Sequence, residues 1–485
     1  IITMKSVFTS LTLLLLSVFL HAEVVIHPPL PGFDRAGDFR VYVNGKESFV
    51  ANADPFAFTM FDFEGKAEIV IETRSDLKWV DLRPLGDKIP VKWSDHRISF
   101  TIEKPAQLSV ELNGENERPL YIIANPLENK IPNYNAPNVK VFKAGEIYEI
   151  KDYKIDDNQI LYMKAGSVLK GMVQLDDVNN VKILGRGIID GGMNEEWDLP
   201  RLLKMDHSEN ILVEGITFFN SLRWTVHPSN CKNVVIDNIK ILNWDTGSDG
   251  VDINSSQKVI VKNSFLRCND DCIVLKAMGE RSYYPNEKMI AQNVDSILVD
   301  NCVMWNMAWG NALEIGFELR SKEVKNIIFR NCDIINVERG AALSIHNGDW
   351  AHVHNVLYEN IRIENAQHKI FDVAIFLSQY SYDRPADEEV RRQQYKHGAW
   401  DGVQIEIEGK EEFHKQFRGK ISNITYRNIS IMDGPVPFSL FVGYDDEHEI
   451  ENVKIDNYSY YGRTARNIHE GRIFIRNIED FAITY

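Results

Sequence analysis

Cysteine is scarce in this chain of 485 residues, and its placement is uneven. The five cysteines all lie in the middle of the sequence, at positions 231, 268, 272, 302 and 332. An odd, clustered set does not match the disulfide framework of a small secreted domain. Cys268 and Cys272 also lack the second nearby Cys or His pair that a structural zinc site needs. We therefore expect small apolar core residues, and we predict neither a metal site nor a cofactor.

Positive charge is also in short supply, because 54 Lys and Arg against 70 Asp and Glu give a formal net charge of −16. Proteins that bind DNA, RNA or anionic membranes need a basic face, so these classes of partner are excluded. A charge of this sign does not attract a polyanionic substrate over long range either, although a local basic subsite could still bind one.

A long hydrophobic run is missing as well. The apolar run within MKSVFTSLTLLLLSVFLHAE is shorter than the ~20 residues of a membrane-spanning helix. With Lys5 before the run and Ala22 after it, the pattern predicts a secretory signal peptide over residues 1–22. We expect a secreted or periplasmic protein with no membrane span after signal removal, and we expect a monomer.

Two regions follow, and the first alternates polar and apolar side chains in short runs. Examples are FRVYVNGKESFV, KAEIVIET, RISFTIE and QLSVELNG. Such runs, separated by NG and EKP turns, predict an antiparallel β-sandwich over residues 23–135. No catalytic residue types gather there, so we interpret this region as an accessory domain. The stretch NPLENKIPNYNAPN, rich in Pro and Asn, predicts a connector.

A repeated motif characterises the second region, residues 136–485. Its copies include NILVEGITF, NVVIDNIKI, KVIVKNSFL, SILVDNCVM, NIIFRNCDI, NVLYENIRI, NITYRNISI and NVKIDNYSY. Each copy has a β-branched strand, a bend at Asn or Gly, and a second strand, which indicates stacked units. The spacing fits one coil of a parallel β-helix, so the predicted fold class is all-β, a sandwich followed by a solenoid. Asn tolerates left-handed backbone at the bends, and its amide can bond along the stack.

Two acidic clusters fall about one coil apart in the solenoid. TGSDGVD carries Asp249 and Asp252, and NDDC carries Asp270 and Asp271. Because adjacent strand residues point to opposite faces, the last two can share a cleft only if the chain bends between them. Glycoside hydrolysis needs one protonated carboxyl and one ionised carboxylate. Mutual repulsion raises the pKa of at least one member of such a cluster and keeps a proton available.

These motifs resemble those of glycoside hydrolase family 28, the polygalacturonase family of right-handed parallel β-helices. GSDGVD, NDDC and GNALEIG correspond to three family motifs, and the resemblance runs from GRGIIDGG at 185 to LEIG at 316. It implies that Asp270 is the general acid of an inverting hydrolysis. It also implies that Asp249 and Asp271 hold and deprotonate the attacking water, with Asp252 in support.

The chain departs from the family pattern at two places. Asn311 stands where the family has a histidine, and an amide cannot titrate. Ala342 and Ser344 stand where an Arg-x-Lys motif would bind a uronate carboxylate. Other candidates for substrate-binding or supporting roles are Glu314, Lys276, His346, Asn347 and Trp350, and the aromatic rings of Trp224, Trp244 and Trp309 are candidates for stacking on sugars.

The sequence thus predicts a secreted inverting glycoside hydrolase that cleaves a plant or algal polysaccharide or its oligosaccharides. The altered uronate-binding positions leave open a neutral or sulfated glycan as substrate, such as a dextran-like α-glucan or a galactan. A β-helical polysaccharide lyase and a non-catalytic glycan-binding solenoid are further alternatives. The lyase would use calcium and a basic residue, and no Lys or Arg is placed as an obvious base beside the acidic cluster.

Overall fold

The computed structural model describes residues 23–192, 201–279, 290–384 and 409–485. The predicted signal peptide, 1–22, lies outside the described residues, as do 280–289 and 385–408, which contain much of the sequence inserted between repeats. In the described part, no helix is long and apolar enough to cross a membrane. Two short helices occur there, a 3-10 helix at Leu85–Asp87 and α2 at Glu411–Lys415.

The N-terminal region is a sandwich of two sheets with mainly antiparallel pairing. One sheet contains β1 (Glu23–Ile26), β4 (Val50–Asn52), β5 (Ala57–Glu64), β7 (Val80–Arg83), β10 (Ala106–Leu112) and β11 (Glu115–Pro126). The other contains β2 (Phe39–Val43), β3 (Lys46–Ser48), β6 (Ala67–Thr73), β8 (Lys92–Ser94) and β9 (Arg97–Ile102). The period-2 pattern of the sequence puts residues such as Val41, Ile69 and Leu108 in the core between the sheets.

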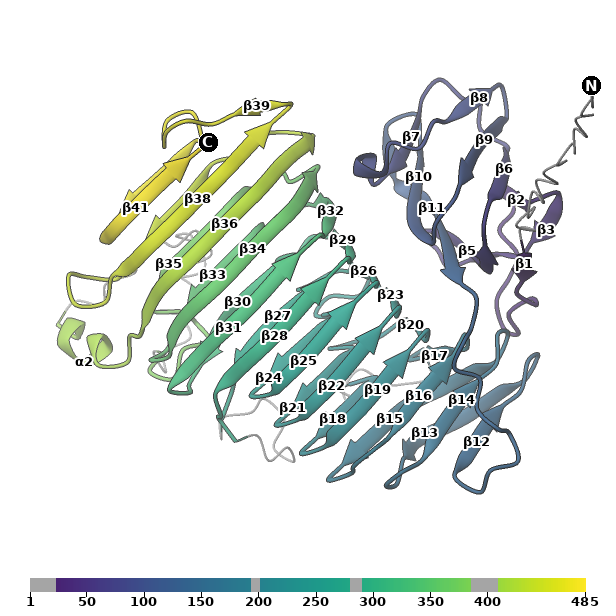
Figure 1. Ribbon diagram of the computed structural model, residues 1–485, viewed down its shortest axis with the longest axis horizontal. Helices are drawn as coiled ribbons and strands as arrows, with labels where there is room; N and C mark the ends of the chain where they lie inside the picture. Colours follow the sequence, from purple (N-terminus) through teal and green to yellow (C-terminus); the bar gives the residue numbers. More distant parts are fainter. Residues whose placement is uncertain (1–22, 193–200, 280–289, 385–408) are drawn as a thin grey trace, which may run out of the picture.

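The rest of the chain is a parallel β-helix whose strands stack into three faces (Figure 1). The predicted fold class is confirmed. We name the faces A, B and C, and each is an extended ladder of strands from successive coils.

Face A contains β15 (Val168–Asp176), β18 (Leu203–Asp206), β21 (Val226–Ser229), β24 (Val251–Asn254), β27 (Ile273–Ala277), β30 (Leu313–Leu319), β33 (Ala341–Asn347), β35 (Lys369–Ile375), β37 (Ser439–Val442) and β40 (Ile473–Arg476). Face B contains β12 (Val139–Phe142), β14 (Ile160–Met163), β16 (Lys182–Gly185), β19 (Glu209–Glu214), β22 (Lys232–Asp237), β25 (Gln257–Lys262), β28 (Val294–Asp300), β31 (Glu323–Arg330), β34 (His352–Glu364), β36 (Lys420–Asp433), β38 (Ile450–Tyr460) and β41 (Ile478–Thr484). Face C contains β17 (Ile188–Asp190), β20 (Thr217–Phe219), β23 (Lys240–Leu242), β26 (Phe265–Cys268), β29 (Val303–Asn306) and β32 (Asp333–Val337). At the two ends lie β13 (Ile147–Lys154), which pairs with β15, and β39 (Arg463–Thr464), which pairs with β38.

Asparagine ladders run along both edges of face B. At one edge Asn452 donates its Nδ2 to Oδ1 of Asn423 at 2.7 Å, and at the other Asn457 donates to Asn428 at 2.9 Å. These residues have positive φ, between 52° and 59°. The ladder residues therefore make the bends and link consecutive coils at the same time, as the repeat motif predicts.

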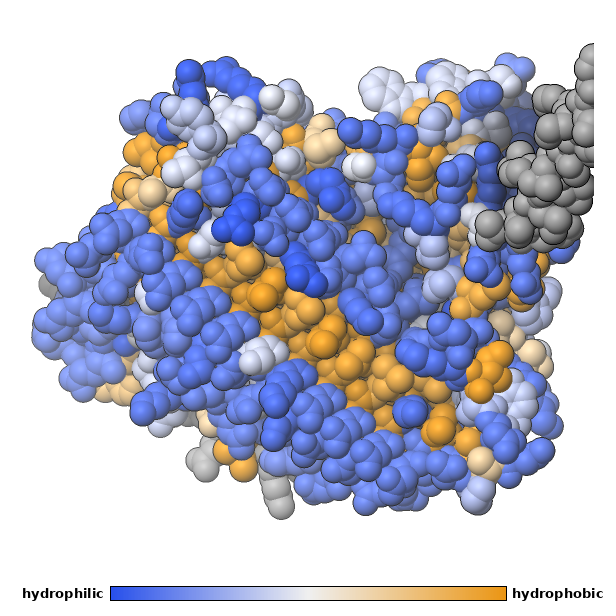
Figure 2. Space-filling view, in the orientation of Figure 1, coloured by the Kyte–Doolittle hydropathy of each residue, from blue (hydrophilic) through white to orange (hydrophobic). Residues whose placement is uncertain are grey.

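The outer surface of face B carries a half-buried apolar stripe (Figure 2). Its members occupy one register position on six consecutive strands: Leu212, Val235, Ile260, Leu298, Ile328 and Leu357. Inside the solenoid, the alternate residues of these strands form the core together with all five cysteines. The cysteines are free and buried, as their predicted core role requires.

The sandwich packs on face C. Phe56, Phe58 and Tyr121 of the sandwich form one apolar cluster with outward-facing residues of five successive coils, Phe219, Leu242, Phe265, Trp305 and Ile335. A buried ion pair adds to this contact, because Arg83 of β7 donates to Glu364 of β34 at 2.7 Å. The sandwich is therefore attached to the solenoid through an apolar cluster and a buried ion pair.

Candidate active site

The candidate site lies in the stacked turns that lead from face C to face A. The register of β24, β27, β30 and β33 pairs Val251, Ile273, Leu313 and Leu343 across successive coils. The ladder continues backwards into the turns, since Gly250 N donates to Asp271 O at 2.8 Å and Cys272 N to Asn311 O at 2.9 Å. Two residues before each of those four strand positions stand Asp249, Asp271, Asn311 and Ala341, which therefore occupy equivalent places on four coils.

Three carboxylates meet in these turns. Asp249, Asp270 and Asp271 each place one carboxylate oxygen within 4.8 Å of the others. Asp249 and Asp271 are buried, whereas Asp270 is half-buried. A bend brings the two adjacent aspartates together, and the backbone N–H of Asp271 donates to Oδ1 of Asp270 at 3.0 Å. The three side chains could also offer one oxygen each to a divalent cation.

Burial and repulsion raise the pKa values in this cluster. Burial raises the pKa of Asp249 well above its ordinary value, and the charges of Asp252, Asp270 and Asp271 raise it further. Burial and the charge of Asp270 do the same for Asp271. Burial also raises the pKa of Asp270, against the opposing charge of Lys276. A pKa raised in this way keeps a proton on the carboxyl group to higher pH, as general acid catalysis requires.

Asp252 lies behind this trio on the outer surface of β24. It is 0% exposed, and neither of its carboxylate oxygens has a hydrogen-bond partner among the described residues. Burial raises its pKa to about 7, with Lys276 and Arg201 acting in the opposite direction. Asp252 is thus a fourth acid, whose charge raises the pKa of Asp249 and whose own pKa is raised by Asp270.

Asn311 holds Asp271 in place. Its backbone N–H donates to Oδ1 of Asp271 at 2.7 Å, and its Nδ2 donates to Oε2 of Glu314 at 3.0 Å. Its Oδ1 accepts from the backbone N–H of Ala341 at 2.8 Å. With its amide engaged on both sides, Asn311 orients the carboxylate of Asp271 and links it to the next coils.

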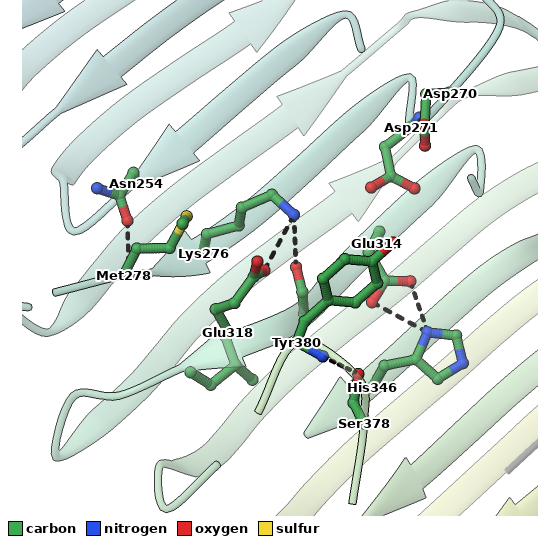
Figure 3. A network of polar contacts seen from close by, with 12 residues as sticks. Asn254, Asp270, Asp271, Lys276, Met278, Glu314, Glu318, His346, Ser378 and Tyr380 are labelled. Atoms are coloured by element: carbon green, nitrogen blue, oxygen red, sulfur yellow. Dashed lines mark hydrogen bonds and ion pairs between the residues drawn. The ribbon is translucent and has the colours of Figure 1, made fainter. Parts of the chain in front are cut away.

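From Glu314 a line of buried side chains crosses face A (Figure 3). Nδ1 of His346 lies 3.0 Å from Oε2 of Glu314, and its Nε2 lies 3.4 Å from Asp372, which pairs with Lys369 at 3.1 Å. Burial lowers the pKa of His346, but the charges of Glu314 and Asp372 outweigh burial and raise it to about 10. His346 is therefore an imidazolium between two carboxylates, and its ring stacks on Phe317 with centroids 4.7 Å apart.

Lys276 acts electrostatically on the whole acidic cluster. Its positive charge opposes the rise in pKa of all four aspartates. Its Nζ lies 3.3 Å from Oε2 of Glu318 (Figure 3) and 5.3 Å from the ring centroid of Trp224. Burial lowers the pKa of Lys276, but the charges of Glu318 and Asp271 raise it well above its ordinary value. Lys276 is therefore a charged, buried partner of the acids.

Other predicted site residues make their contacts elsewhere. Asn347 donates to the backbone carbonyl of Ala351 at 2.7 Å. Trp350 packs against Tyr382, with ring centroids 5.6 Å apart. Trp244 packs against Phe56 of the sandwich at 5.8 Å. These contacts belong to the segment after β33 and to the sandwich interface rather than to the acidic cluster.

The two positions where the family pattern has cations serve other purposes. Ala342 belongs to the solenoid core, and Ser344 donates its hydroxyl to Glu314. Sequence reasoning missed Asp372 and Glu318 altogether. A signal for Asp372 was available, because KIFDVAI places two charged residues, Lys369 and Asp372, in a buried run, and Asp372 lies one coil beyond Ser344, with which it pairs in register.

The protein is thus a parallel β-helix with a carboxylate cluster in the turns before face A. Residues 154–375, which include the whole cluster, match the family model described as glycosyl hydrolases family 28. The predicted resemblance to glycoside hydrolase family 28 is confirmed for this segment of the chain.

Similar proteins extend this finding. Exopolygalacturonase B of Aspergillus niger is 27% identical over 236 residues, which are 43% of this chain and 49% of that protein. The chain spans less than half the length of such curated relatives, from 41% to 49% of the first three. Among solved structures, Dex49A from Penicillium minioluteum has a TM-score of 0.61 at 14% identity, over 93% of this chain and 94% of that one. A hyperthermoactive exopolygalacturonase from Thermotoga maritima has a TM-score of 0.50 at 16% identity, over 70% and 84%. At these identities the structural matches establish the fold.

Proposed function

We propose that this protein hydrolyses glycosidic bonds of a polysaccharide by an inverting reaction in which three aspartates take part. One observation carries the proposal: Asp249, Asp270 and Asp271, from two adjacent coils, place carboxylate oxygens within 4.8 Å of one another. Packing alone gives no reason to gather mutually repelling acids, whereas proton transfer at a glycosidic oxygen does.

In the proposed reaction Asp270 is the general acid. It is the most exposed of the three, so it can reach the glycosidic oxygen, and burial raises its pKa. Asp249 and Asp271 bind a water and accept its proton as the water oxygen bonds to the anomeric carbon. The bond from that carbon to the leaving oxygen breaks, and this oxygen takes the proton of Asp270. Asn311 supports the reaction by fixing Asp271.

The substrate we propose is a pectin-type galacturonan or a related acidic glycan. The family 28 segment and the polygalacturonases similar to it support this class. A neutral glycan is the second candidate, and the observation that favours it is the use of positions 342 and 344 for the core and for Glu314. We also propose export from the cell, on the basis of the signal-like segment at residues 1–22.

The experiment is a screen for released reducing ends with homogalacturonan, rhamnogalacturonan, dextran and sulfated galactans. The D270N variant is assayed beside the wild type on each glycan that is cleaved. We expect turnover of an acidic glycan and its loss by at least about 1000-fold in D270N, with unchanged circular dichroism. Full activity of D270N would contradict the assigned acid, and the absence of any cleaved glycan would contradict the enzyme.

A further inference from the structure

Beyond the acids, the same stacked turns carry a tryptophan and an arginine. Four residues before Ile273, Leu313 and Leu343, which pair in register, stand Asn269, Trp309 and Arg339. The backbone confirms the stacking of the first two, because Trp309 N donates to Asn269 O at 2.9 Å. Since neighbouring strands lie ~4.8 Å apart, Trp309 and Arg339 stand within about two coils of the Asp270 turn.

Two glycines pack the turns of this pair closely against the Asp270 turn. Gly310 follows Trp309, and a Cβ on Gly310 would lie 2.4 Å from Oδ1 of Asp270. Gly340 follows Arg339 and packs equally closely, since a Cβ there would lie 1.7 Å from the carbonyl oxygen of Gly310. The two glycines therefore let the turns of Trp309 and Arg339 stack in close contact with the turn that carries Asp270.

Arg339 is exposed, and its guanidinium carbon lies 5.0 Å from the ring centroid of the half-buried Trp309. Among the residues that the structure describes, no carboxylate pairs with Arg339. Arg339 differs in this from the buried cations Lys276, Arg320 and Arg418, which all pair with carboxylates. Arg339 thus presents an exposed cation, supported by an aromatic ring, on a coil near the Asp270 turn.

We propose that Trp309 and Arg339 form a subsite for the sugar next to the scissile bond, in which Arg339 binds an anionic substituent of that sugar. A guanidinium binds carboxylate and sulfate oxygens through two parallel hydrogen bonds, and an indole ring supports a pyranose from below. The chain thereby supplies one cation from a turn, in place of the two missing at Ala342 and Ser344. This inference rests on the proposed function, because Asp270 defines where the scissile bond lies.

The test measures binding without turnover, by calorimetric titration of proteins that all carry D270N. Three ligands separate the chemistry: a galacturonate oligosaccharide, the same oligosaccharide with methyl-esterified carboxyls, and a sulfated galactan oligosaccharide. We expect R339Q to weaken binding of a charged ligand by about 10-fold or more and R339K to weaken it less. The affinity for the methyl-esterified oligosaccharide should change less than about 2-fold in both R339Q and R339K. W309A should weaken binding of the charged ligands and of the methyl-esterified oligosaccharide to the same extent.

A matched control is R427Q, which removes a half-exposed arginine of face B that pairs with Glu359. R427Q should leave the affinity for all three ligands unchanged. Equal binding of the charged ligands by R339Q and its parent would overturn the inference, as would a parent that binds the ester better than the acid. If the wild type cleaves no glycan while the arginine-dependent binding is present, the proposed function fails and the subsite stands. Whichever charged ligand depends on Arg339 identifies the anion as carboxylate or sulfate.

Discussion

His346 and Glu314 lie in contact on adjacent coils of face A, with Nδ1 of the imidazole 3.0 Å from Oε2 of the carboxylate. Both side chains are buried, at 1% and 0% exposure. Glu314 also accepts the amide of Asn311, which in turn holds Asp271. The imidazolium therefore contacts the acidic cluster through two intermediates, and we expect it to act as a positioning residue.

Replacing His346 by Gln should destabilise the protein and slow the reaction. Glu314 would keep a buried charge without its cation, which costs about 3–5 kcal/mol of unfolding free energy. We expect a fall in Tm and a fall of about 10-fold in kcat with little change in KM, measured by thermal unfolding and steady-state kinetics.

The double variant E314Q/H346Q is the decisive comparison. Removing both charges should recover most of the stability lost in H346Q, because the uncompensated charge is gone. Additive losses would contradict an ion pair. H354Q, which removes a histidine of face B near Glu323, is the control and should leave kcat unchanged.

The stereochemistry of the product tests the role of Asp249 and Asp271. Carboxyl groups of inverting enzymes usually lie about 6.5–9.5 Å apart and those of retaining enzymes about 5–5.5 Å. The close approach of the oxygens here, within 4.8 Å, makes the measurement informative. We expect the first product, followed by NMR during hydrolysis, to have the opposite anomeric configuration to the substrate. Retained configuration would make one aspartate a nucleophile.

Asp252 should make the protein less stable as the pH rises. Its pKa is raised to about 7 by burial, so between the ordinary value of 3.8 and 7 the folded state binds more protons than the unfolded state. Stability is then greatest at low pH and is lost as the pH rises through this window. We expect D252N to raise Tm by about 2–4 °C at pH 8 and by less at pH 4.5.

The matched control for D252N is D446N, which removes an exposed aspartate in the loop before β38. Its Tm should follow the wild type at both pH values. A D252N protein that is less stable than wild type at pH 8 would show that the carboxylate is compensated in the folded state.

Removal of divalent cations should leave hydrolysis unchanged. The proposed mechanism uses carboxylates and water, with Lys276 as the nearby cation. We expect the same kcat after dialysis against EDTA as after addition of calcium, with no ultraviolet-absorbing unsaturated product. Loss of activity on chelation together with that product would instead indicate a lyase.

The acidic trio could be placed from sequence because its members follow a regular coil length. Two clusters one repeat apart must lie on adjacent coils, and a bend between Asp270 and Asp271 follows from the need to bring both acids to one cleft. The contacts of Glu314, His346 and Asp372 could not be found this way. They depend on the exact strand register across three coils, in which Glu314 pairs with Ser344 and Ser344 pairs with Asp372. Because coil lengths differ by a few residues, the repeat spacing alone does not give that register.

Aromatic residues were harder still to place. No local sequence pattern distinguishes Trp244 from Trp309. Trp244 nevertheless packs on the sandwich, whereas the guanidinium of Arg339 lies over the ring of Trp309. Face C accepts another domain because Phe219, Leu242 and Phe265 point outward there. Short β-branched runs do not tell which of their apolar residues point inward, so the docking of the sandwich was not predictable.

The asparagine ladders have a consequence for how such a protein can change. Asn423 and Asn428 join their coil to the previous one at 3.4 and 2.8 Å, although 68 residues separate them from Asn355 and Asn360. Long insertions therefore enter a coil without shifting its alignment with the neighbours. A loop between two coils can therefore change in length while the stack of coils on either side stays the same.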